Sequence, residues 1–332
     1  MSEHAVKVIE ITELHPHANA DRLCLVPVGG WSCVVGKDQF KLGDRAIYIE
    51  PDYVVPLDRP EFAFLRKPDS DKMKHRLKAI RLRGVVSFGL LIAIPEALAD
   101  RAVGDNVIDE LGIERYEPPV KLAPGGLDDG LPQREWPQVY SPKFDVENVQ
   151  RYEDVLRSGE PVVVTEKVDG ASTRYVWKDG RLYIGSRTRW LKADVLTHWT
   201  RAFLNTPQIA AWCEAHPETV LYGETYGPVQ SLRYGRQEPA FVAFAAMHSG
   251  EWQNLPELQR SWAEFGVPFC AKVYAGPYDR DLIARLAESD STHSTVPGHM
   301  MEGVVIVPAI ERRDERIGRV CLKLISIRYW LS

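Results

Sequence analysis

A proline- and glycine-rich stretch, residues 116–139, divides this chain of 332 residues into two parts of different character. Proline lacks a backbone N–H and glycine destabilises helix and strand interiors, so neither element continues through such a stretch. Short apolar segments separated by turn residues precede it, and strand-like segments mixed with helix-like ones follow it. We therefore predict a domain over 1–115, a linker over 116–139 and a second domain over 140–332.

The first part contains only strand-like segments, with no long helical pattern between them. They are VKVIEI, RLCLVPV, SCVVG, RAIYIEP, VVSFGLLIAI and NVIDEL. Many short strands joined by turns are typical of a small β-barrel or sandwich.

The second part mixes strands with three helical patterns. Residues 194–215 carry apolar side chains at helical spacing, and 256–266 and 280–289 read as shorter helices; the apolar positions of the first are Val195, Leu196, Trp199, Phe203 and Leu204. VVVTEKV, STRYVW, RLYIGS, TVLYGET, AFVAFAA, EGVVIV and RVCLKLI read as strands. We predict an α+β domain of antiparallel sheets with flanking helices.

The composition is that of a globular protein, with 45% hydrophobic and 26% charged residues. The sequence has no apolar run of about 18 residues, the length that a membrane helix needs, and its first residues do not resemble a signal peptide. Its five cysteines lack the spacing of metal ligands and read as buried thiols of a reducing compartment. These features predict a cytoplasmic protein that does not interact with membranes.

A basic run stands out against the net charge of −5. Between Arg66 and Arg83 there are eight Lys and Arg residues and two acidic ones. Such a run can neutralise backbone phosphates, although most charge runs are simply solvated surfaces. The candidate nucleic-acid contacts are Lys72, Lys74, Arg76, Lys78, Arg81 and Arg83.

The first strand-like segment of the second domain ends in a lysine that precedes a tight turn, in the order Thr165-Glu166-Lys167-Val168-Asp169-Gly170. A lysine amine is a nucleophile only when neutral, and its ordinary pKa is about 10.4. Lowering that pKa by about 3 units requires roughly 4 kcal/mol, which burial or nearby cations can supply. Taken alone, the same pattern also fits a surface lysine before an ordinary turn.

Further polar side chains follow at the ends of later strands. Each also has an ordinary structural explanation, as a core ring, a solvated carboxylate or a surface ion pair. Together they suit phosphoryl transfer, which needs an amine, cations for the phosphate, carboxylates for a metal and a ring for a base. The residues are Arg187, Glu224, Phe244, Glu302 and Lys323.

The segments KVDG, SR, YGET, FVAF, MEGVV and LKLI, in this order, resemble motifs I, Ia, III, IIIa, IV and V of the covalent nucleotidyltransferases. The resemblance covers about residues 140–332 and implies that Lys167 forms a lysyl-adenylate. It assigns nucleotide contacts to Thr165, Glu166, Lys167, Asp169, Gly170, Arg187, Glu224, Phe244 and Lys323. It also implies that Glu302 helps bind the metal, that Glu224 contacts the ribose, and that Lys167, Lys323 and Glu302 are catalytic. From its residue type, Glu224 is a candidate to hold the metal together with Glu302, through water.

Two positions depart from that pattern. A second lysine often follows two residues after Lys323, where this chain has Ile325. One of two phosphate contacts is therefore expected either to be missing or to come from another residue, such as Arg319 or Arg328. The position five residues after the motif lysine, arginine in DNA ligases and capping enzymes, is Ser172, as in the RNA ligases. The chain also ends nine residues after Lys323, where those enzymes continue into an OB-fold.

The N-terminal segments HPHANADRL, CVVG, LGDRAIYIEP and GVVSFGLL resemble an OB-fold tRNA-binding module over about residues 5–110. An OB-fold ahead of a nucleotidyltransferase domain resembles the RNA ligase family typified by the Deinococcus enzyme. We therefore expect an ATP-dependent RNA ligase that uses Mg²⁺ or Mn²⁺. Its expected partner is RNA, as a nicked duplex or an RNA/DNA hybrid. His15 and His17 are expected to serve the turn rather than a metal.

Two alternatives remain open from the sequence. One is a different nucleotidyltransferase, namely an ATP-dependent DNA ligase or a GTP-dependent capping enzyme. The other is a non-catalytic RNA- or tRNA-binding protein with a decayed ligase half.

Overall fold

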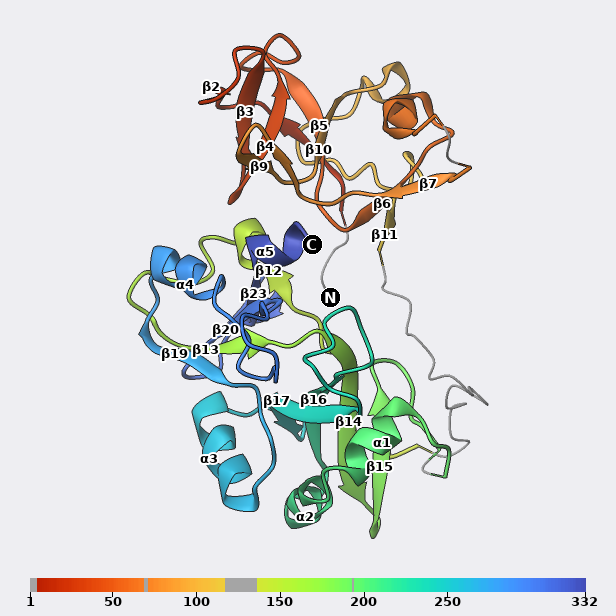
Figure 1. The fold of residues 1–332 in the computed structure, drawn as a ribbon, viewed down its shortest axis with the longest axis vertical. Helices are drawn as coiled ribbons and strands as arrows, with labels where there is room; N and C mark the ends of the chain where they lie inside the picture. The colour runs from red at the N-terminus through yellow and green to blue at the C-terminus, as the bar shows by residue number, and fades with distance from the viewer. Residues whose placement is uncertain (1–4, 69–70, 117–135, 193) are drawn as a thin grey trace. The chain divides into compact units, whose positions relative to one another are not determined.

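The computed structural model describes residues 5–68, 71–116, 136–192 and 194–332. The chain divides near residue 118 into two compact units (Figure 1). The last residues, Trp330–Ser332, count with the first unit. The predicted linker 116–139 lies mainly outside the described residues. No helix in the described ranges is long and apolar enough to cross a membrane.

The N-terminal unit is built from small sheets with strand orders β1-β5-β10, β2-β3-β4 and β11-β6-β7, and a hairpin β8-β9. Alternation drives its packing: in β4 the side chains of Trp31, Cys33 and Val35 are buried while the residues between them are half-exposed. The strands are β1 Lys7–Glu10, β2 His15–Pro16, β3 Leu23–Val28, β4 Trp31–Gly36, β5 Arg45–Ile49, β6 Tyr53–Pro56, β7 Lys74–Arg76, β8 Ile80–Leu82, β9 Val85–Ser87, β10 Leu90–Ala93 and β11 Glu114–Arg115, with 3₁₀ turns η1 Pro60–Leu65 and η2 Glu96–Leu98.

Two predicted strands of this unit are wrong in detail. Residues 85–94 form two strands, because the chain turns at Gly89, which has φ 75° and whose missing Cβ would lie 2.3 Å from the carbonyl oxygen of Ile49. Residues 106–111 form no strand beyond a single bridge between Asn106 and Lys7. His17 serves the turn as expected: its Nδ1 accepts a hydrogen bond from the Asn19 amide at 3.0 Å.

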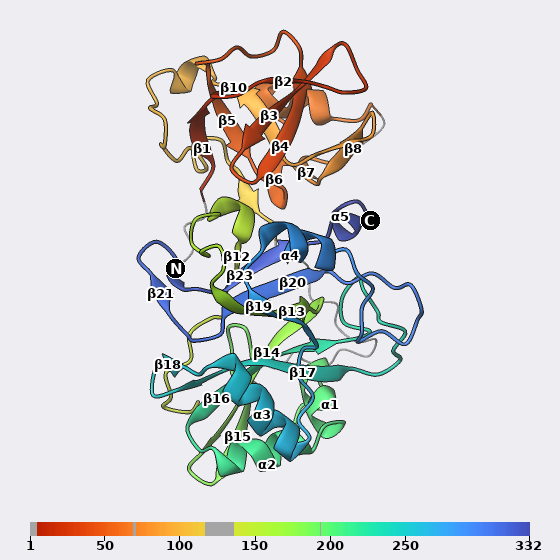
Figure 2. The same ribbon diagram turned by 90° about the vertical axis from the view of Figure 1, so that its left-hand side faces the viewer.

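The C-terminal unit has two larger sheets, with strand orders β12-β23-β20-β13-β19 and β15-β14-β16-β17-β18 (Figure 2). Their pairings are antiparallel as predicted, except that β12 runs parallel to β23. The strands are β12 Glu147–Asn148, β13 Pro161–Lys167, β14 Gly170–Lys178, β15 Arg181–Ser186, β16 Thr219–Tyr226, β17 Ala240–His248, β18 Glu251–Trp252, β19 Lys272–Pro277, β20 Gly303–Pro308, β21 Arg313–Asp314, β22 Gly318–Arg319 and β23 Leu322–Ile325.

Helices cover the outer faces of these sheets. Side chains of α1 His198–Leu204, α2 Gln208–Ala215 and α3 Leu255–Phe265 share one core with β14, β16 and β17 (Figure 2). Helix α4 Arg280–Leu286 packs on β13 and β20, a short turn η3 Val149–Arg151 follows β12, and α5 Ile327–Trp330 ends the chain.

The helix predicted over 194–215 is two helices. Pro207 is the N-cap of α2, and Asn205 already ends α1, so the helical hydrogen bonds are interrupted there. Leu196 and Leu204, assigned to the apolar face, are 59% and 66% exposed.

Candidate active site

Lys167 lies where the two sheets of the C-terminal unit are joined. It ends β13 in one sheet, and Gly170 begins β14 in the other, so Val168 and Asp169 cross between them. A Cβ on Gly170 would lie 2.2 Å from the carbonyl oxygen of Thr225, which explains why glycine is needed at this crossing. The predicted turn after the lysine is therefore a junction between sheets.

A buried ion pair forms between Lys167 and Glu302. The Lys167 Nζ donates to Glu302 Oε2 at 2.7 Å, and the two side chains are 23% and 11% exposed. Glu302 directly precedes β20, whose first residue, Gly303, pairs with Lys167. Burial raises the pKa of Glu302, and the charges of Lys167 and Lys323 act against that rise. The structure thus brings together the three residues that the sequence marked as catalytic.

The expected depression of the Lys167 pKa is wrong. Burial by itself lowers this pKa, but the carboxylates of Glu302, Glu224 and Asp169 outweigh burial and raise it. The charged groups that act on the Lys167 amine are carboxylates, not the cations that would lower its pKa. Lys167 is therefore held as a cation until those charges are neutralised.

Glu224 lies on β16 opposite Ser172 of β14. Burial raises its pKa to about 8, with the Lys167 charge opposing the shift and the Glu302 and Asp169 charges adding to it.

Glu224 makes the stability of the nucleotide-free protein depend on pH. Its folded pKa of about 8 lies above the ordinary 4.5, so its contribution is complete below pH 4.5 and is lost as pH rises through 8. Replacing Glu224 by glutamine removes that loss, which is worth roughly 4 kcal/mol between pH 5 and pH 8.5. We therefore expect the melting temperature relative to wild type to be higher by about 8 °C or more at pH 8.5 than at pH 5. Thermal melts at both pH values measure this; the exposed Glu251→Gln serves as control, and an unchanged difference would contradict the assigned pKa.

Arg187 follows β15 and is 42% exposed. Its guanidinium pairs with the carboxylate of Asp145, a partner that no sequence pattern indicated. The neighbouring backbone is fixed by Arg174, which is buried, donates from Nε to the Ser186 carbonyl at 2.9 Å and from Nη1 to the Ser141 carbonyl at 2.8 Å. Arg174 thus supports both the strand end before Arg187 and the segment that carries Asp145.

Phe244 sits at a β-bulge in β17. Tyr222 pairs with Ala245 and Gly223 with Ala243, so Phe244 is the extra residue between them. Its ring is half-buried and lies 4.6 Å from that of Phe144, at 48°. At the bulge, the Phe244 side chain need not follow the alternation of side chains between the two faces of the sheet. Its ring neighbour Phe144 was not identified from the sequence.

The two residues before Lys167 are buried in β13. Thr165 pairs with Val305 of β20. The Glu166 carboxylate accepts from the Thr292 amide and hydroxyl, both at 2.9 Å, and from the Ser291 hydroxyl. The Glu166 side chain therefore anchors a loop, and the Glu166 amide is engaged as well, since it donates to the Ala271 carbonyl at 2.8 Å.

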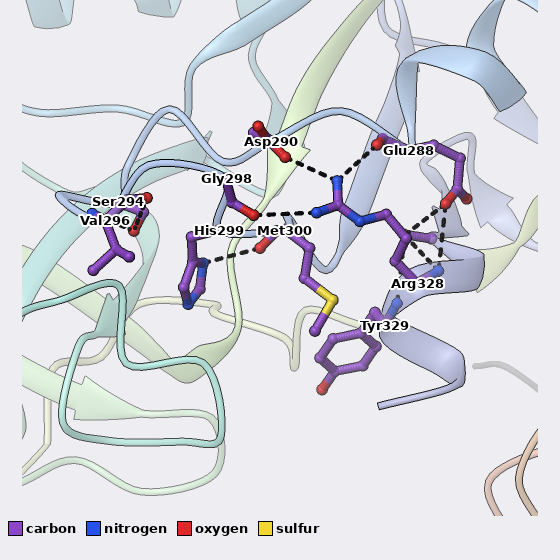
Figure 3. Close-up of polar contacts among 10 residues, drawn as sticks. Glu288, Asp290, Ser294, Val296, Gly298, His299, Met300, Arg328 and Tyr329 are labelled. Carbon is purple, nitrogen blue, oxygen red and sulfur yellow. Dashed lines mark hydrogen bonds and ion pairs between the residues drawn. The ribbon is translucent and has the colours of Figure 1, made fainter.

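Lys323 lies on β23 opposite Val305. Its charge is near enough to Glu302 to oppose the rise in pKa that burial causes at that carboxyl. The two arginines considered as replacements for a second lysine are engaged elsewhere. Arg319 pairs with Glu311, donating from Nε at 2.9 Å. Arg328 donates to Asp290 at 2.8 Å and to the Gly298 carbonyl at 3.1 Å (Figure 3).

The basic run lies on the N-terminal unit and is partly paired with acids. Lys74 pairs with Glu114 at 2.7 Å, and Arg76 donates to Asp52 while its guanidinium lies 3.7 Å from the centre of the Tyr116 ring. The other basic side chains and backbones are engaged as well. Lys78 donates to the Ser332 carbonyl at 3.0 Å and Arg81 to that of Gly84 at 3.1 Å. The Arg83 carbonyl accepts from the Asn19 side-chain amide at 3.1 Å, and Lys72 also takes part in an interaction.

Comparison with known proteins identifies the family. The RNA ligase family model matches residues 160–325, half of the chain, and an OB-fold domain model matches residues 5–94. The chain belongs to the RNA ligase family. The predicted fold, an OB-fold domain followed by a nucleotidyltransferase domain, is thereby confirmed, as is the prediction of an RNA ligase enzyme. A search of curated proteins found no match.

Solved structures of an RNA ligase from Naegleria gruberi resemble this RNA ligase over nearly the whole chain. The structure with PPi has a TM-score of 0.82 and 25% identity and covers 99% of this chain and 98% of its own. A mutant with ATP and Mn has the same TM-score and identity and covers 98% of both chains. A mutant with AMP and Mn has a TM-score of 0.81, with 25% identity, 99% of this chain and 98% of its own.

Proposed function

We propose that this RNA ligase forms a covalent adenylate on Lys167 as its first step. The observation that carries the proposal is the buried Lys167–Glu302 pair at the junction of the two sheets. In this step the Nζ lone pair attacks the α-phosphorus of ATP, the bond to pyrophosphate breaks, and the proton of the amine is released. Lys323 and Arg187 are the cations assigned to the phosphoryl charge that develops.

The similar Naegleria ligase supports these roles, because its mutants have been solved with ATP and Mn. Alanine replaces a lysine, a glutamate and a second lysine in three of them and an aspartate in a further, apo mutant. The spacing of these four positions along that chain equals the spacing of Lys167, Glu224, Lys323 and Asp169 here. We assign ATP as the substrate on this basis.

The donor set suits Mg²⁺ or Mn²⁺. Glu302 and Glu224 offer hard carboxylate oxygens, and Mg²⁺ at nucleotide sites is commonly held by one or two carboxylates, waters and substrate phosphates. In the described ranges no three His, Cys, Asp or Glu side chains gather as metal ligands, so water and phosphate would complete the coordination. The ion supplies charge neutralisation at the triphosphate, and the same charge beside Glu302 and Glu224 favours the neutral amine of Lys167.

We further propose that the adenylate passes to a 5′-phosphate end and that a 3′-hydroxyl of RNA then displaces AMP, sealing a nick in a duplex or an RNA/DNA hybrid. Phe244 is assigned to stack on the adenine, and Thr165, Glu166, Asp169 and Gly170 to line the nucleotide site. Incubation with α-³²P-ATP or α-³²P-GTP, followed by sealing of nicks with a 3′-terminal ribose or deoxyribose, tests this. We expect label from ATP alone and faster sealing at ribose; label from GTP, or equal sealing at deoxyribose, would favour a capping enzyme or a DNA ligase.

The basic run is proposed to hold the RNA, with Lys72, Lys78, Arg81 and Arg83 in contact with phosphates. Each phosphate contact that is lost should reduce the slope of log affinity against log salt by roughly 0.9. Replacing Lys78 and Arg81 by glutamine should therefore weaken binding to a nicked duplex and reduce that slope by about 2. Fluorescence anisotropy between about 50 and 200 mM salt measures it. The matched control is Lys41→Gln, an exposed lysine of the same unit outside the basic run. A wild-type affinity insensitive to salt would remove this role.

We also propose an N-terminal domain over 1–115, a linker over 116–139 and a C-terminal domain over 140–332. The proposed location is the cytoplasm. All five cysteines are buried free thiols, which suits a reducing compartment.

A further inference from the structure

The turn after Lys167 is held by one loop, residues 227–239, between β16 and β17. The Asp169 Oδ2 accepts from the Ser231 hydroxyl at 2.8 Å and from the Leu232 amide at 3.0 Å. The Asp169 amide donates to the Tyr234 hydroxyl at 2.7 Å. Both the backbone and the side chain of Asp169 are therefore fixed from this loop.

Tyr234 is itself rigidly placed. Its side chain is fully buried and its φ is 54°, a left-handed conformation that is uncommon for a non-glycine residue and that clusters at functional sites. The Tyr226 ring meets the Tyr234 ring edge-on, with 5.2 Å between the ring centres. The Tyr234 carbonyl accepts a hydrogen bond from the Thr295 amide at 3.0 Å. The hydroxyl is thereby aimed at the turn with little freedom to move away.

Thr295 belongs to a second loop, residues 289–300, which also contacts the strand before Lys167. Thr292 in this loop donates to the Glu166 carboxylate, and Arg328 binds Asp290 and Gly298 near the two ends of the loop (Figure 3). The His299 ring lies 5.3 Å from that of Tyr234 (Figure 3 shows His299 beside Met300). Tyr234 therefore connects two loops, one that fixes Glu166 before the lysine and one that fixes Asp169 after it.

We propose that the Tyr234 hydroxyl is a positioning group for lysyl-adenylate formation. The Asp169 amide is partly buried, and without the Tyr234 hydroxyl it has to move to find another acceptor. Lys167 is two residues away on the same turn, and a displacement of about 1 Å at a reacting atom can cost roughly 10²-fold in rate. The inference rests on the proposed function of Lys167.

The test is Tyr234→Phe in the full chain, measured by single-turnover labelling with α-³²P-ATP over a range of ATP concentrations. We expect the maximal rate of label formation to fall about 10- to 100-fold. The ATP concentration for half-maximal rate should change by less than about threefold, because Ser231 and Leu232 still hold the Asp169 side chain in place. Sealing of a pre-adenylylated RNA strand in a nick should stay within about threefold of wild type, since Lys167 is not the nucleophile in that step.

Tyr274→Phe is the matched control, because it removes a tyrosine hydroxyl that donates to the Pro277 carbonyl at 3.0 Å on an exposed part of β19. A wild-type labelling rate in Tyr234→Phe, or equal losses in labelling and in sealing of the pre-adenylylated strand, would overturn the proposal. If thermal melts show that Tyr234→Phe does not fold, Ser231→Ala tests the same loop and should reduce labelling selectively. Absence of label in the wild type would instead count against the proposed function.

Discussion

Lys167→Ala is expected to form no protein-bound label from α-³²P-ATP with either Mg²⁺ or Mn²⁺. The amine is the attacking atom of the proposed first step, and no neighbouring group replaces a missing nucleophile. The label on the wild type should be acid-labile and lost on adding pyrophosphate, since a phosphoramidate is cleaved by acid and the step is reversible. Because the protein can be purified already adenylylated, mass spectrometry for added AMP accompanies the labelling.

Lys178→Ala is the control for this substitution. Lys178 lies in β14 and pairs with the exposed Glu218, away from the junction of the sheets. Its replacement should leave labelling unchanged. Measurable adenylylation of Lys167→Ala would mean that another residue carries the nucleotide, and the assignment of Lys167 would be wrong.

Glu302→Ala has the second largest expected effect, a loss of about 10²-fold or more in labelling and in sealing, with the fold retained. The variant removes a carboxylate assigned to the metal and also the strongest electrostatic support for the Lys167 cation. The pKa of Lys167 should therefore fall, so the residual rate of labelling should reach its plateau at a lower pH than in wild type. Rates between pH 6 and 10 measure both effects.

Glu302→Gln separates the two contributions, because it keeps a hydrogen-bond acceptor for Lys167 and removes the charge. Glu251→Ala, at an exposed position of β18, is the control for loss of a carboxylate elsewhere. Near-normal sealing by a folded Glu302→Ala protein would exclude Glu302 from the site. An unchanged pH profile would show instead that Glu302 does not control the amine.

The local features that the sequence determined are those with a short-range physical signal. Helix α3 follows from its apolar spacing and ends at Gly266, whose φ of 71° suits a helix C-terminus. The sequence predicted the turn after Lys167 from a single glycine, Gly170. The structure explains this glycine, because any Cβ at that position would collide with the Thr225 carbonyl. The order of Lys167, Glu224, Glu302 and Lys323 along the strands was likewise sufficient to predict that they share one site.

Only the tertiary structure decided how these side chains are paired. Glu302 is 135 residues from Lys167 in the sequence, and its carboxylate raises the pKa of the Lys167 amine. From the sequence, this pKa was expected to be lowered. The partners of Arg187 and Arg328, the bulge at Phe244 and the role of Tyr234 likewise depend on contacts between distant segments. Sequence periodicity shows which face of an element is buried, but charge pairing depends on distances between atoms, which exist only once the two sheets have packed.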